Sequence, residues 1–258
     1  DDEIVIGMCP KLMNDGYMIA AGAGAQEACD ELGYRLDFNG PVSADITEQS
    51  DIINQWTQKG YSAITISAND PDALAPAMQA AKDAGICTSA WDADVSFEAR
   101  DLFLNQATYE GIGTTMVDEL AKAGVTSGNV LVVTSTLTAP NQNAWLEVIE
   151  DYLEENYPDI KIVDVLPGNE DLAESKDVTY NYLMSHNDTV AVIGLSGNAT
   201  PGVCEAVEQL DLAGKIKVVG IAVPSTIGDY LKSGTCNAGI LWSPQDIGYC
   251  AIYMAKAQ

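Results

Sequence analysis

Short apolar runs alternate with longer amphipathic segments along the whole chain. The short runs are rich in Val and Ile and are typical of buried strands, whereas the longer segments repeat their apolar residues with helical spacing. The predicted strands are Ile4–Met8, Tyr34–Phe38, Ala63–Ser67, Ile86–Trp91, Asp101–Asn105, Asn129–Ser135, Ile160–Val165, Val190–Leu195, Val218–Ala222 and Ala238–Trp242. The predicted helices are Asp15–Leu32, Thr47–Lys59, Pro71–Ala84, Gln142–Asn156, Val178–Ser185, Pro201–Leu210, Ser225–Lys232 and Asp246–Lys256.

This alternation predicts parallel sheets flanked by helices. A break in the pattern over residues 106–128 divides the predicted strands into two equal groups. We therefore expect an α/β fold with two Rossmann-like parallel-sheet lobes joined by a hinge. The N-terminal lobe is predicted to contain residues 1–106 and 244–258, and the C-terminal lobe residues 107–243. The chain would cross between the lobes near Gln106–Ala107 and again near Ser243–Pro244.

Polar and aromatic residues gather directly after the predicted strands. Open parallel sheets bind ligands outside the carboxyl ends of their strands, so these residues are the candidates for a binding site. In the first lobe the candidates are Lys11, Asn14, Tyr17, Asp92 and Asp94. The remaining candidates are Asn141, Gln142, Ser196, Gly197, Ala222 and Trp242. Amides, carboxylates, hydroxyls and one amine can bond to ring hydroxyls, and aromatic faces pack on sugar C–H groups, so this set predicts a small sugar-like ligand.

Several of these residues also have a simpler structural interpretation. Asp94 could stabilise a turn, and Asn141 could cap the helix that follows it. Tyr17 and Trp242 could pack between elements or in a core. Lys11 is harder to explain in this way, because lysine is scarce in this chain and is rarely buried without a partner.

Charge and composition exclude several other classes of function. The 258 residues include 38 acidic and 12 basic side chains, a formal charge of −26, which repels phosphate backbones and anionic lipid, so we expect neither nucleic-acid nor membrane-surface binding. No apolar run is long enough for a transmembrane helix. Asp1-Asp2-Glu3 has no feature of a signal peptide and resembles the start of a mature or trimmed chain.

The motifs of cofactor-dependent enzymes and metal sites are missing from the sequence. There is no GxxxxGK[ST], and the nearest approach to GxGxxG, at Gly22–Glu27, lacks its third glycine and lies inside a predicted helix. A single histidine, His186, rules out histidine-pair metal sites and makes a Ser/His/Asp triad improbable. The six cysteines have no CxxC or metal-type spacing, and we expect free, buried thiols. The prediction is a binding protein without cofactor or metal that is not an enzyme.

Five segments distributed over the chain carry a resemblance to a known family. They are KLMNDGYMIAAGAGAQ at 11–26, ISANDPDAL at 66–74, WDAD at 91–94, NQNAW at 141–145 and LWSPQDIG at 241–248. Together they resemble the type I periplasmic sugar-binding proteins of ABC transporters, in the branch that contains rhamnose-binding proteins and the autoinducer-2 receptor. The resemblance implies the two-lobed fold, ligand binding by hinge closure, and export, either to the periplasm or as a lipoprotein on the outer face of the cell membrane. It also implies docking of a monomer onto a transporter permease.

The resemblance also assigns individual residues. Lys11, Asp92 and Gln142 match ligand-binding residues of the autoinducer-2 receptor. Asn141 stands where that receptor has an aspartate, and Leu195 and Gly197 stand where it has proline and alanine.

These departures weigh against autoinducer-2 as the ligand. Asn141–Asn143 and Asp171–Ala173 are more similar to the rhamnose-type branch, and Ala222 stands where ribose binders carry an aspartate. A deoxyhexose or related small sugar is therefore the expected ligand. An autoinducer-2 receptor is the alternative, and a sugar-modifying enzyme is more remote. The sensor part of a transcription repressor is opposed by the charge.

Family members continue beyond the last predicted helix with another strand and a third crossing between lobes. The printed sequence ends at Gln258, and we expect a chain without that strand to be less stable than one that has it.

Overall fold

The computed structural model describes residues 3–257, which divide into two compact units. The first unit contains the chain up to Gln106, together with Thr138–Asn141 and everything from Trp242 onward. The second contains Ala107–Leu137 and Gln142–Leu241. The sequence placed residues 138–141 and 242–243 in the C-terminal lobe, whereas here these short segments pack with the first unit. Residues 1, 2 and 258, which the sequence assigned to the N-terminal lobe, lie outside the described part of the chain.

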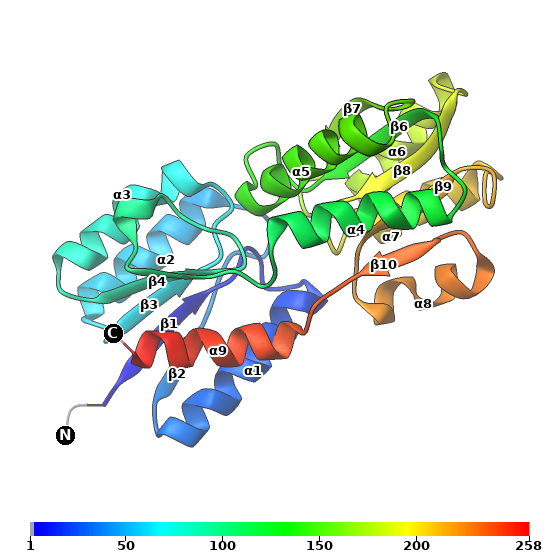
Figure 1. Cartoon of the computed structure of the whole chain (residues 1–258). Helices are drawn as coiled ribbons and strands as arrows, with labels where there is room; N and C mark the ends of the chain where they lie inside the picture. The colour runs from blue at the N-terminus through cyan, green and yellow to red at the C-terminus, as the bar shows by residue number, and fades with distance from the viewer. Residues whose placement is uncertain (1–2, 258) are drawn as a thin grey trace. The chain divides into compact units, whose positions relative to one another are not determined.

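The first unit is built on a parallel sheet (Figure 1). Its strands lie in the order β2-β1-β3-β4-β5, and every pair is parallel. The strands are β1 (Val5–Cys9), β2 (Arg35–Phe38), β3 (Ala63–Ile66), β4 (Cys87–Trp91) and β5 (Leu102–Leu104). The helices are α1 (Gly16–Leu32), α2 (Ile46–Lys59), α3 (Pro71–Asp83), the short 3₁₀ helix η1 (Phe97–Ala99) and α9 (Pro244–Lys256).

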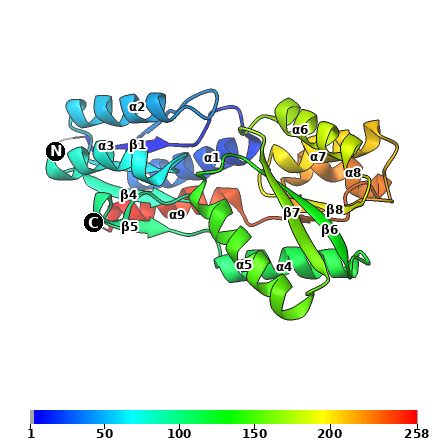
Figure 2. The ribbon, with the colours of Figure 1, turned by 90° about the horizontal axis from the view of Figure 1, so that it is seen from above.

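Helices cover both faces of this sheet, with α1 and α9 on one face and α2 and α3 on the other (Figure 2). Helices α1 and α9 approach each other closely because a glycine of each helix lies against the backbone of the other. A Cβ at Gly24 would collide with the carbonyl of Gln245, and one at Gly248 would collide with the carbonyl of Ala21. The segment from Trp242 onward is therefore an integral part of the first unit.

The second unit repeats the same topology. Its strands lie in the order β10-β9-β8-β6-β7, again all parallel. The strands are β6 (Gly128–Thr134), β7 (Ile160–Pro167), β8 (Thr189–Gly194), β9 (Lys217–Ile221) and β10 (Ala238–Ile240). The helices are α4 (Tyr109–Lys122), α5 (Pro140–Asn156), α6 (Leu172–Ser185), α7 (Ala199–Gln209) and α8 (Pro224–Ser233). The predicted α/β fold with two parallel sheets is confirmed.

Two helices differ from the prediction. The sequence pattern predicts no helix or strand for residues 106–128, but helix α4 occupies most of that stretch. Its Gly111 and Gly113 weaken the local helical signal, and Gly113 is needed because a Cβ there would collide with Val148 of α5. Helix α6 begins at Leu172 rather than Val178, since Asp171 caps it and Ser175 hydrogen-bonds back to the Asp171 carbonyl. The first turn of α6 is polar, so the sequence has no apolar pattern there that would predict a helix.

The helices begin and end where capping residues stand. The side chains of Asp15, Asp45, Asp70 and Asp171 accept hydrogen bonds from backbone amides in the first turns of α1, α2, α3 and α6. Several helices end on a glycine in the left-handed conformation, such as Gly33 after α1. Part of the large acidic excess therefore has a local structural use, because anions are favourable at helix N-termini.

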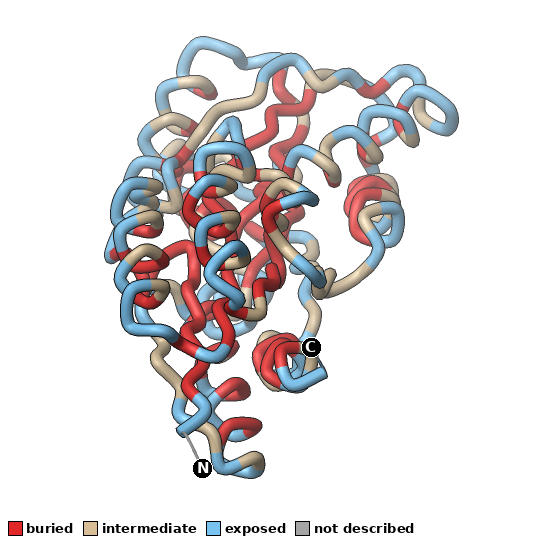
Figure 3. The backbone as a smooth tube through the Cα atoms, turned by 90° about the vertical axis from the view of Figure 1, so that its left-hand side faces the viewer, coloured by how far each residue is buried: buried red, intermediate tan, exposed pale blue. Residues whose placement is uncertain are grey.

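Each unit has its own apolar core between sheet and helices (Figure 3). In the first unit Trp56, Ile64 and Met78 are buried in one cluster. In the second, Val133 and Val192 from the sheet pack on helix α7. Central strands such as β1 and β3 are buried along their whole length and are continuously apolar or nearly so, which is the pattern that made them predictable.

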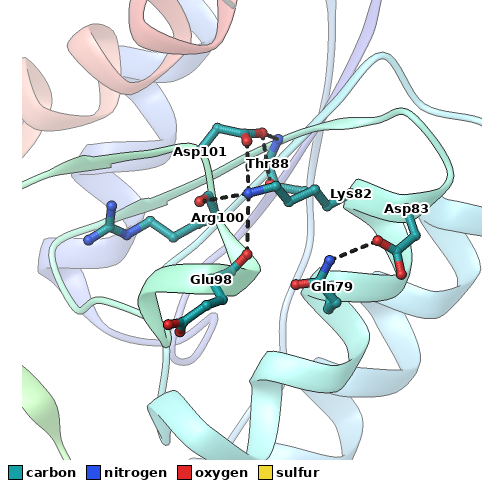
Figure 4. A network of polar contacts seen from close by, with 7 residues as sticks. All are labelled: Gln79, Lys82, Asp83, Thr88, Glu98, Arg100 and Asp101. Carbon is teal, nitrogen blue, oxygen red and sulfur yellow. Dashed lines mark hydrogen bonds and ion pairs between the residues drawn. The ribbon is translucent and has the colours of Figure 1, made fainter.

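A polar network fixes the amino-terminal edge of the first sheet (Figure 4). Lys82 lies at the end of α3 and forms an ion pair of 3.0 Å with Asp101, just before β5. Asp101 also accepts hydrogen bonds from the amide and hydroxyl of Thr88 in β4, at 3.2 and 3.1 Å. The Lys82 ammonium further donates to the carbonyls of Glu98 and Arg100, both at 3.2 Å. This network joins α3, β4 and β5 at the edge opposite to the predicted site.

Candidate functional site

Lys11 is a buried cation in the loop after β1. Only 2% of its surface is exposed. Its ammonium donates to the side-chain oxygen of Asn141 at 3.1 Å, and its backbone carbonyl accepts from the amide of Asn69 at 2.9 Å. An isolated buried ammonium is very costly, so its position beside polar groups indicates a use for the charge.

Asp92, directly after β4, is a buried anion. Its backbone has φ of 61°, in the left-handed region that Asp and Asn adopt more readily than most residues. This conformation turns the side chain inward, where it is 3% exposed. One carboxylate oxygen accepts from the Tyr17 hydroxyl at 3.2 Å and the other from the Ser67 hydroxyl at 3.0 Å.

Burial and the neighbouring charges set the protonation of these groups. Burial raises the pKa of the Asp92 carboxyl above its ordinary value, while the charge of Lys11 and the hydrogen bonds from Ser67 and Tyr17 act in the opposite direction. Burial, followed by the charge of Asp92, raises the pKa of Tyr17 well above its ordinary value. Tyr17 therefore keeps its proton near neutral pH and can donate it to Asp92.

Trp242 extends this arrangement from the segment before α9. Its indole nitrogen donates to the Tyr17 hydroxyl at 2.7 Å, and the two rings meet edge to face with centroids 5.7 Å apart. A continuous chain of hydrogen bonds therefore runs from Trp242 through Tyr17 to Asp92. The two rings also supply the kind of aromatic surface on which the C–H face of a sugar packs.

A second set of polar residues holds the loops that carry this site. The side-chain amide of Gln49, in α2, donates to the carbonyls of Pro10 and Ser67, both at 2.9 Å. Its oxygen accepts from the backbone and side-chain nitrogens of Asn69, at 3.2 and 2.9 Å. Gln49 is fully buried and thereby ties the loop after β1 to the loop after β3.

We call Lys11, Tyr17, Ser67, Asn69, Asp92, Asn141 and Trp242 the polar cluster.

Ser67, Asn69 and Gln49 were missed by the sequence reading. Ser67 and Asn69 follow β3, so the rule that selected the other candidates applies equally to them. Gln49 lies in the interior of a helix, and nothing in the local sequence distinguishes it from a solvated glutamine.

Two candidates of the first unit lie apart from the polar cluster. Asn14 is exposed in the loop before α1. Both oxygens of Asp94 accept from the guanidinium of Arg100, at 2.8 and 2.7 Å. This bidentate ion pair closes the loop after β4, which matches the structural interpretation of Asp94 as a residue that stabilises a turn.

Asn141 belongs to the first unit in the structure rather than to the opposite lobe. It lies in the first turn of α5, one residue after the helix begins at Pro140, and so it is not the helix cap. Its side-chain oxygen accepts the hydrogen bond from the Lys11 ammonium described above. The helix start therefore carries an acceptor to the buried ammonium.

The candidates of the second unit have local structural contacts. The side-chain oxygen of Gln142 accepts from the Thr134 hydroxyl at 2.6 Å and the Ser135 amide at 2.7 Å, at the end of β6. The Ser196 hydroxyl accepts from the amide of Ala199 at 3.0 Å, at the start of α7. Gly197 is partly buried beside it, and Ala222 is packed in the apolar core.

The chemistry of the polar cluster suits binding of an uncharged polar molecule. It combines one buried cation, one buried anion, hydroxyls, amides and two aromatic rings. Among the described residues, no group of three or more His, Cys, Asp or Glu side chains is arranged to hold a metal ion. His186, the single histidine of the sequence, lies on the surface beside Tyr182 and Ser185.

The chain is similar to a protein family, to a bacterial sugar-binding protein and to several solved structures. The family model described as periplasmic binding protein domain matches residues 6–258. The D-ribose/D-allose-binding protein of Pseudomonas aeruginosa is 28% identical over 242 residues, which cover 89% of this chain and 74% of that protein. Within residues 3–257, no helix is long and apolar enough to span a membrane.

Solved structures agree closely with the fold. LsrB from Clostridium saccharobutylicum, in complex with AI-2, has a TM-score of 0.93 and 28% identity, and the match covers 98% of this chain and 81% of that one. A solute-binding protein of an ABC transporter from Clostridium phytofermentas, with bound L-rhamnose, has a TM-score of 0.94 and 25% identity, covering 99% and 81% of the two chains.

Proposed function

Because the chain belongs to the periplasmic binding protein family, among the sugar-binding proteins of ABC transporters, we propose that it delivers a deoxyhexose or related small sugar to an importer. The relatives bind L-rhamnose, AI-2, and D-ribose or D-allose, all small polar molecules. The polar cluster supports a neutral polar ligand of this kind.

The single observation that carries the proposal is the presence of a buried cation, Lys11, and a buried anion, Asp92, near enough for their charges to interact. A buried cation and a buried anion compensate each other, so a neutral ligand introduces no uncompensated charge, whereas a sugar acid or sugar phosphate would. Each ligand hydroxyl left without a partner would cost roughly 1–3 kcal/mol. Carboxylate oxygens accept and the ammonium donates, so neighbouring hydroxyls of one sugar can be bonded in both directions.

We further propose that residues after the strands of the second unit, including Gln142 and Ser196, complete the contacts with the ligand. Binding would then favour a closed arrangement of the two units, since the ligand has higher affinity for that form. The expected export, to the periplasm or as a lipoprotein on the outer face of the cell membrane, is part of the same proposal, as are the docking onto a permease and the monomeric state. So is the absence of catalysis, because binding alone accounts for the polar cluster.

The test is a survey of ligands with the purified chain. Native mass spectrometry would identify any co-purifying molecule, and isothermal titration calorimetry would then measure L-rhamnose, D-ribose, D-allose, D-arabinose and AI-2. We expect L-rhamnose or a close relative to bind in the micromolar range or tighter and to be recovered chemically unchanged. Failure of all neutral sugars to bind, or conversion of a bound sugar to product, would reject the proposal.

Reception of AI-2 is a second candidate function. It is favoured by the presence of both Lys11 and Asp92 in one cluster and by the likeness to the AI-2 complex. A bacterial reporter strain for AI-2, treated with ligand released from the denatured protein, separates the two candidates. We expect no response, and a strong response would replace the sugar by AI-2.

A further inference from the structure

Two cysteines of the second unit lie together in its core and take no part in the proposed binding site. All six cysteines are free thiols in the structure. Cys204, in α7, and Cys236, in the segment between α8 and β10, are both buried and belong to the same apolar cluster. The other four thiols are distributed between β1, α1, β4 and α9 of the first unit.

Hydrogen bonds next to the two cysteines independently place their segments together. Thr235, directly before Cys236, donates its hydroxyl proton to Glu208 at 2.7 Å, and Glu208 lies one helical turn after Cys204 on α7. The amide of Cys236 donates to the carbonyl of Tyr230 at 3.0 Å, which fixes the segment from the other side. The segment therefore passes over the face of α7 that carries Cys204.

The two thiols interact directly and differ in character. A hydrogen bond from Cys204 lowers the pKa of Cys236, although burial opposes this, and the same bond together with burial raises the pKa of Cys204. The Cys236 thiol also donates to the carbonyls of Val218, at 3.7 Å, and Ala238, at 3.5 Å. The directions of the two shifts favour Cys236 as the thiol that ionises first.

We propose that Cys204 and Cys236 are an oxidation site, which a small-molecule disulfide converts into an intramolecular disulfide joining α7 to the segment before β10. Strand β10 has three residues and lies at the edge of its sheet, so local opening there needs to break few backbone hydrogen bonds. Such opening gives the oxidant access to Cys236 without unfolding the core.

The reaction is two successive thiol–disulfide exchanges. The Cys236 thiolate, its proton lost to solvent, attacks one sulfur of the small disulfide, forming a mixed disulfide and releasing one small thiolate. Cys204 then loses its proton and attacks the Cys236 sulfur, which releases the second small thiolate. Two protein thiols are oxidised to one disulfide, and the small disulfide is reduced to two thiols that take up the two protons.

The experiment uses the full chain and oxidised glutathione. After incubation, remaining thiols are blocked with N-ethylmaleimide, and the protein is digested without reduction for mass spectrometry. We expect a peptide pair linked through Cys204 and Cys236, lighter by two hydrogens than the sum of its reduced parts. Recovery of both cysteines with maleimide attached, or linkage of either to another cysteine, would overturn the proposal.

Variants and a second measurement keep the test independent of folding defects. The Cys204→Ser variant should give Cys236 joined to glutathione and no cross-link, whereas Cys29→Ser, which changes a buried thiol of the first unit, should leave the cross-link intact. The cross-link should raise the melting temperature of the wild-type chain by on the order of 5 °C, reversibly with dithiothreitol. An equal rise in the Cys204→Ser variant would contradict the assignment.

Discussion

The carboxyl ends of the two sheets have the same strand order and very different chemistry. In the first unit this edge carries a buried cation and a buried anion, joined to other polar side chains through hydrogen bonds. In the second unit the two candidates at the equivalent edge with hydrogen bonds are neutral: Gln142 accepts from the Thr134 hydroxyl and the Ser135 amide, and Ser196 accepts from the Ala199 amide at the start of α7. Two sheets of the same topology thus carry side chains of different chemistry at their carboxyl edges.

The buried charges of the first unit should be the main source of the selectivity of the proposed site. A buried charge discriminates strongly between ligands, because a ligand that fails to bond to it leaves it unsatisfied. A neutral hydroxyl or amide that already has a backbone partner discriminates less. We therefore expect substitutions in the first unit to change ligand affinity, and those in the second to act mainly on stability.

The largest expected effect comes from Asp92→Asn. Asparagine tolerates the left-handed backbone, so the fold should be kept, but the anion that faces Tyr17, Ser67 and the proposed ligand is lost. We expect sugar affinity to fall about 100-fold, the equivalent of about 2.7 kcal/mol for charged hydrogen bonds, measured by calorimetry. The control is Asp101→Asn, which makes the same change at the opposite edge of the same sheet and should alter affinity less than about twofold.

The next effect in size is expected from Lys11→Met. This change keeps most of the side-chain volume but removes the ammonium that donates to Asn141, and it leaves Asp92 without a nearby positive charge. Affinity should fall about 30-fold by the same titration. Lys82→Met provides the matched comparison, because Lys82 pairs with Asp101 far from the polar cluster. If both lysine variants lose affinity equally, the contrast between the two edges is wrong.

A smaller effect is expected from Trp242→Phe. Phenylalanine keeps an aromatic ring but cannot donate to the Tyr17 hydroxyl. The loss of one neutral hydrogen bond should reduce affinity about fivefold, or about 1 kcal/mol. Tyr17→Phe removes the same bond from the other side and also the bond to Asp92, so it should reduce affinity more. A larger loss of affinity in Trp242→Phe than in Tyr17→Phe would show that the hydrogen-bond chain does not end at Asp92.

In the second unit, Ser196→Ala should affect stability more than binding. The Ser196 hydroxyl accepts from the amide of Ala199, and its loss should lower the free energy of unfolding by about 1 kcal/mol in urea titrations. Affinity should change about threefold or less. A loss of affinity as large as that of Asp92→Asn would remove the distinction between the two sheet edges.

The smallest effect is a dependence of stability on pH that has opposite signs for two aspartates. The folded-state pKa of Asp92 is raised above its ordinary value of 3.8, so the stability that Asp92 contributes decreases as pH rises through that range. For Asp101 burial acts to raise the pKa, but hydrogen bonds from Lys82 and Thr88 outweigh it and lower the folded-state value. Its contribution is therefore present above the ordinary value and is lost as pH falls through the folded one.

Urea titrations near neutral pH and at about pH 4 measure this contrast. Acidification should stabilise the wild-type chain relative to Asp92→Asn, while the advantage of the wild type over Asp101→Asn should shrink. Lys11, Tyr17 and Asp15 are the titratable groups nearest to Asp92, and none of them is altered in either variant. Equal pH dependence of the two variants would contradict the assigned directions.

Much of this architecture could be predicted from the sequence, because buried parallel strands such as β6 and β8 are continuously apolar. Helix α4 could not, since its glycines serve a tertiary contact with α5 and weaken the local pattern. The rule that ligands bind after strand ends selected Lys11 and Asp92, whose charges interact in the structure, and their role in ligand binding stays a prediction. It could not reveal Gln49, whose role depends on which loops fold against α2, nor the ion pair that holds Asp94.

A crystal structure of the chain with the sugar that binds most tightly in the survey would show whether the polar cluster contacts the ligand. We predict ligand hydroxyls within hydrogen-bonding distance of both the Asp92 carboxylate and the Lys11 ammonium, with a sugar face against Tyr17 or Trp242. A sugar bound with neither Asp92 nor Lys11 in contact would contradict the assignment of the polar cluster as the recognition site.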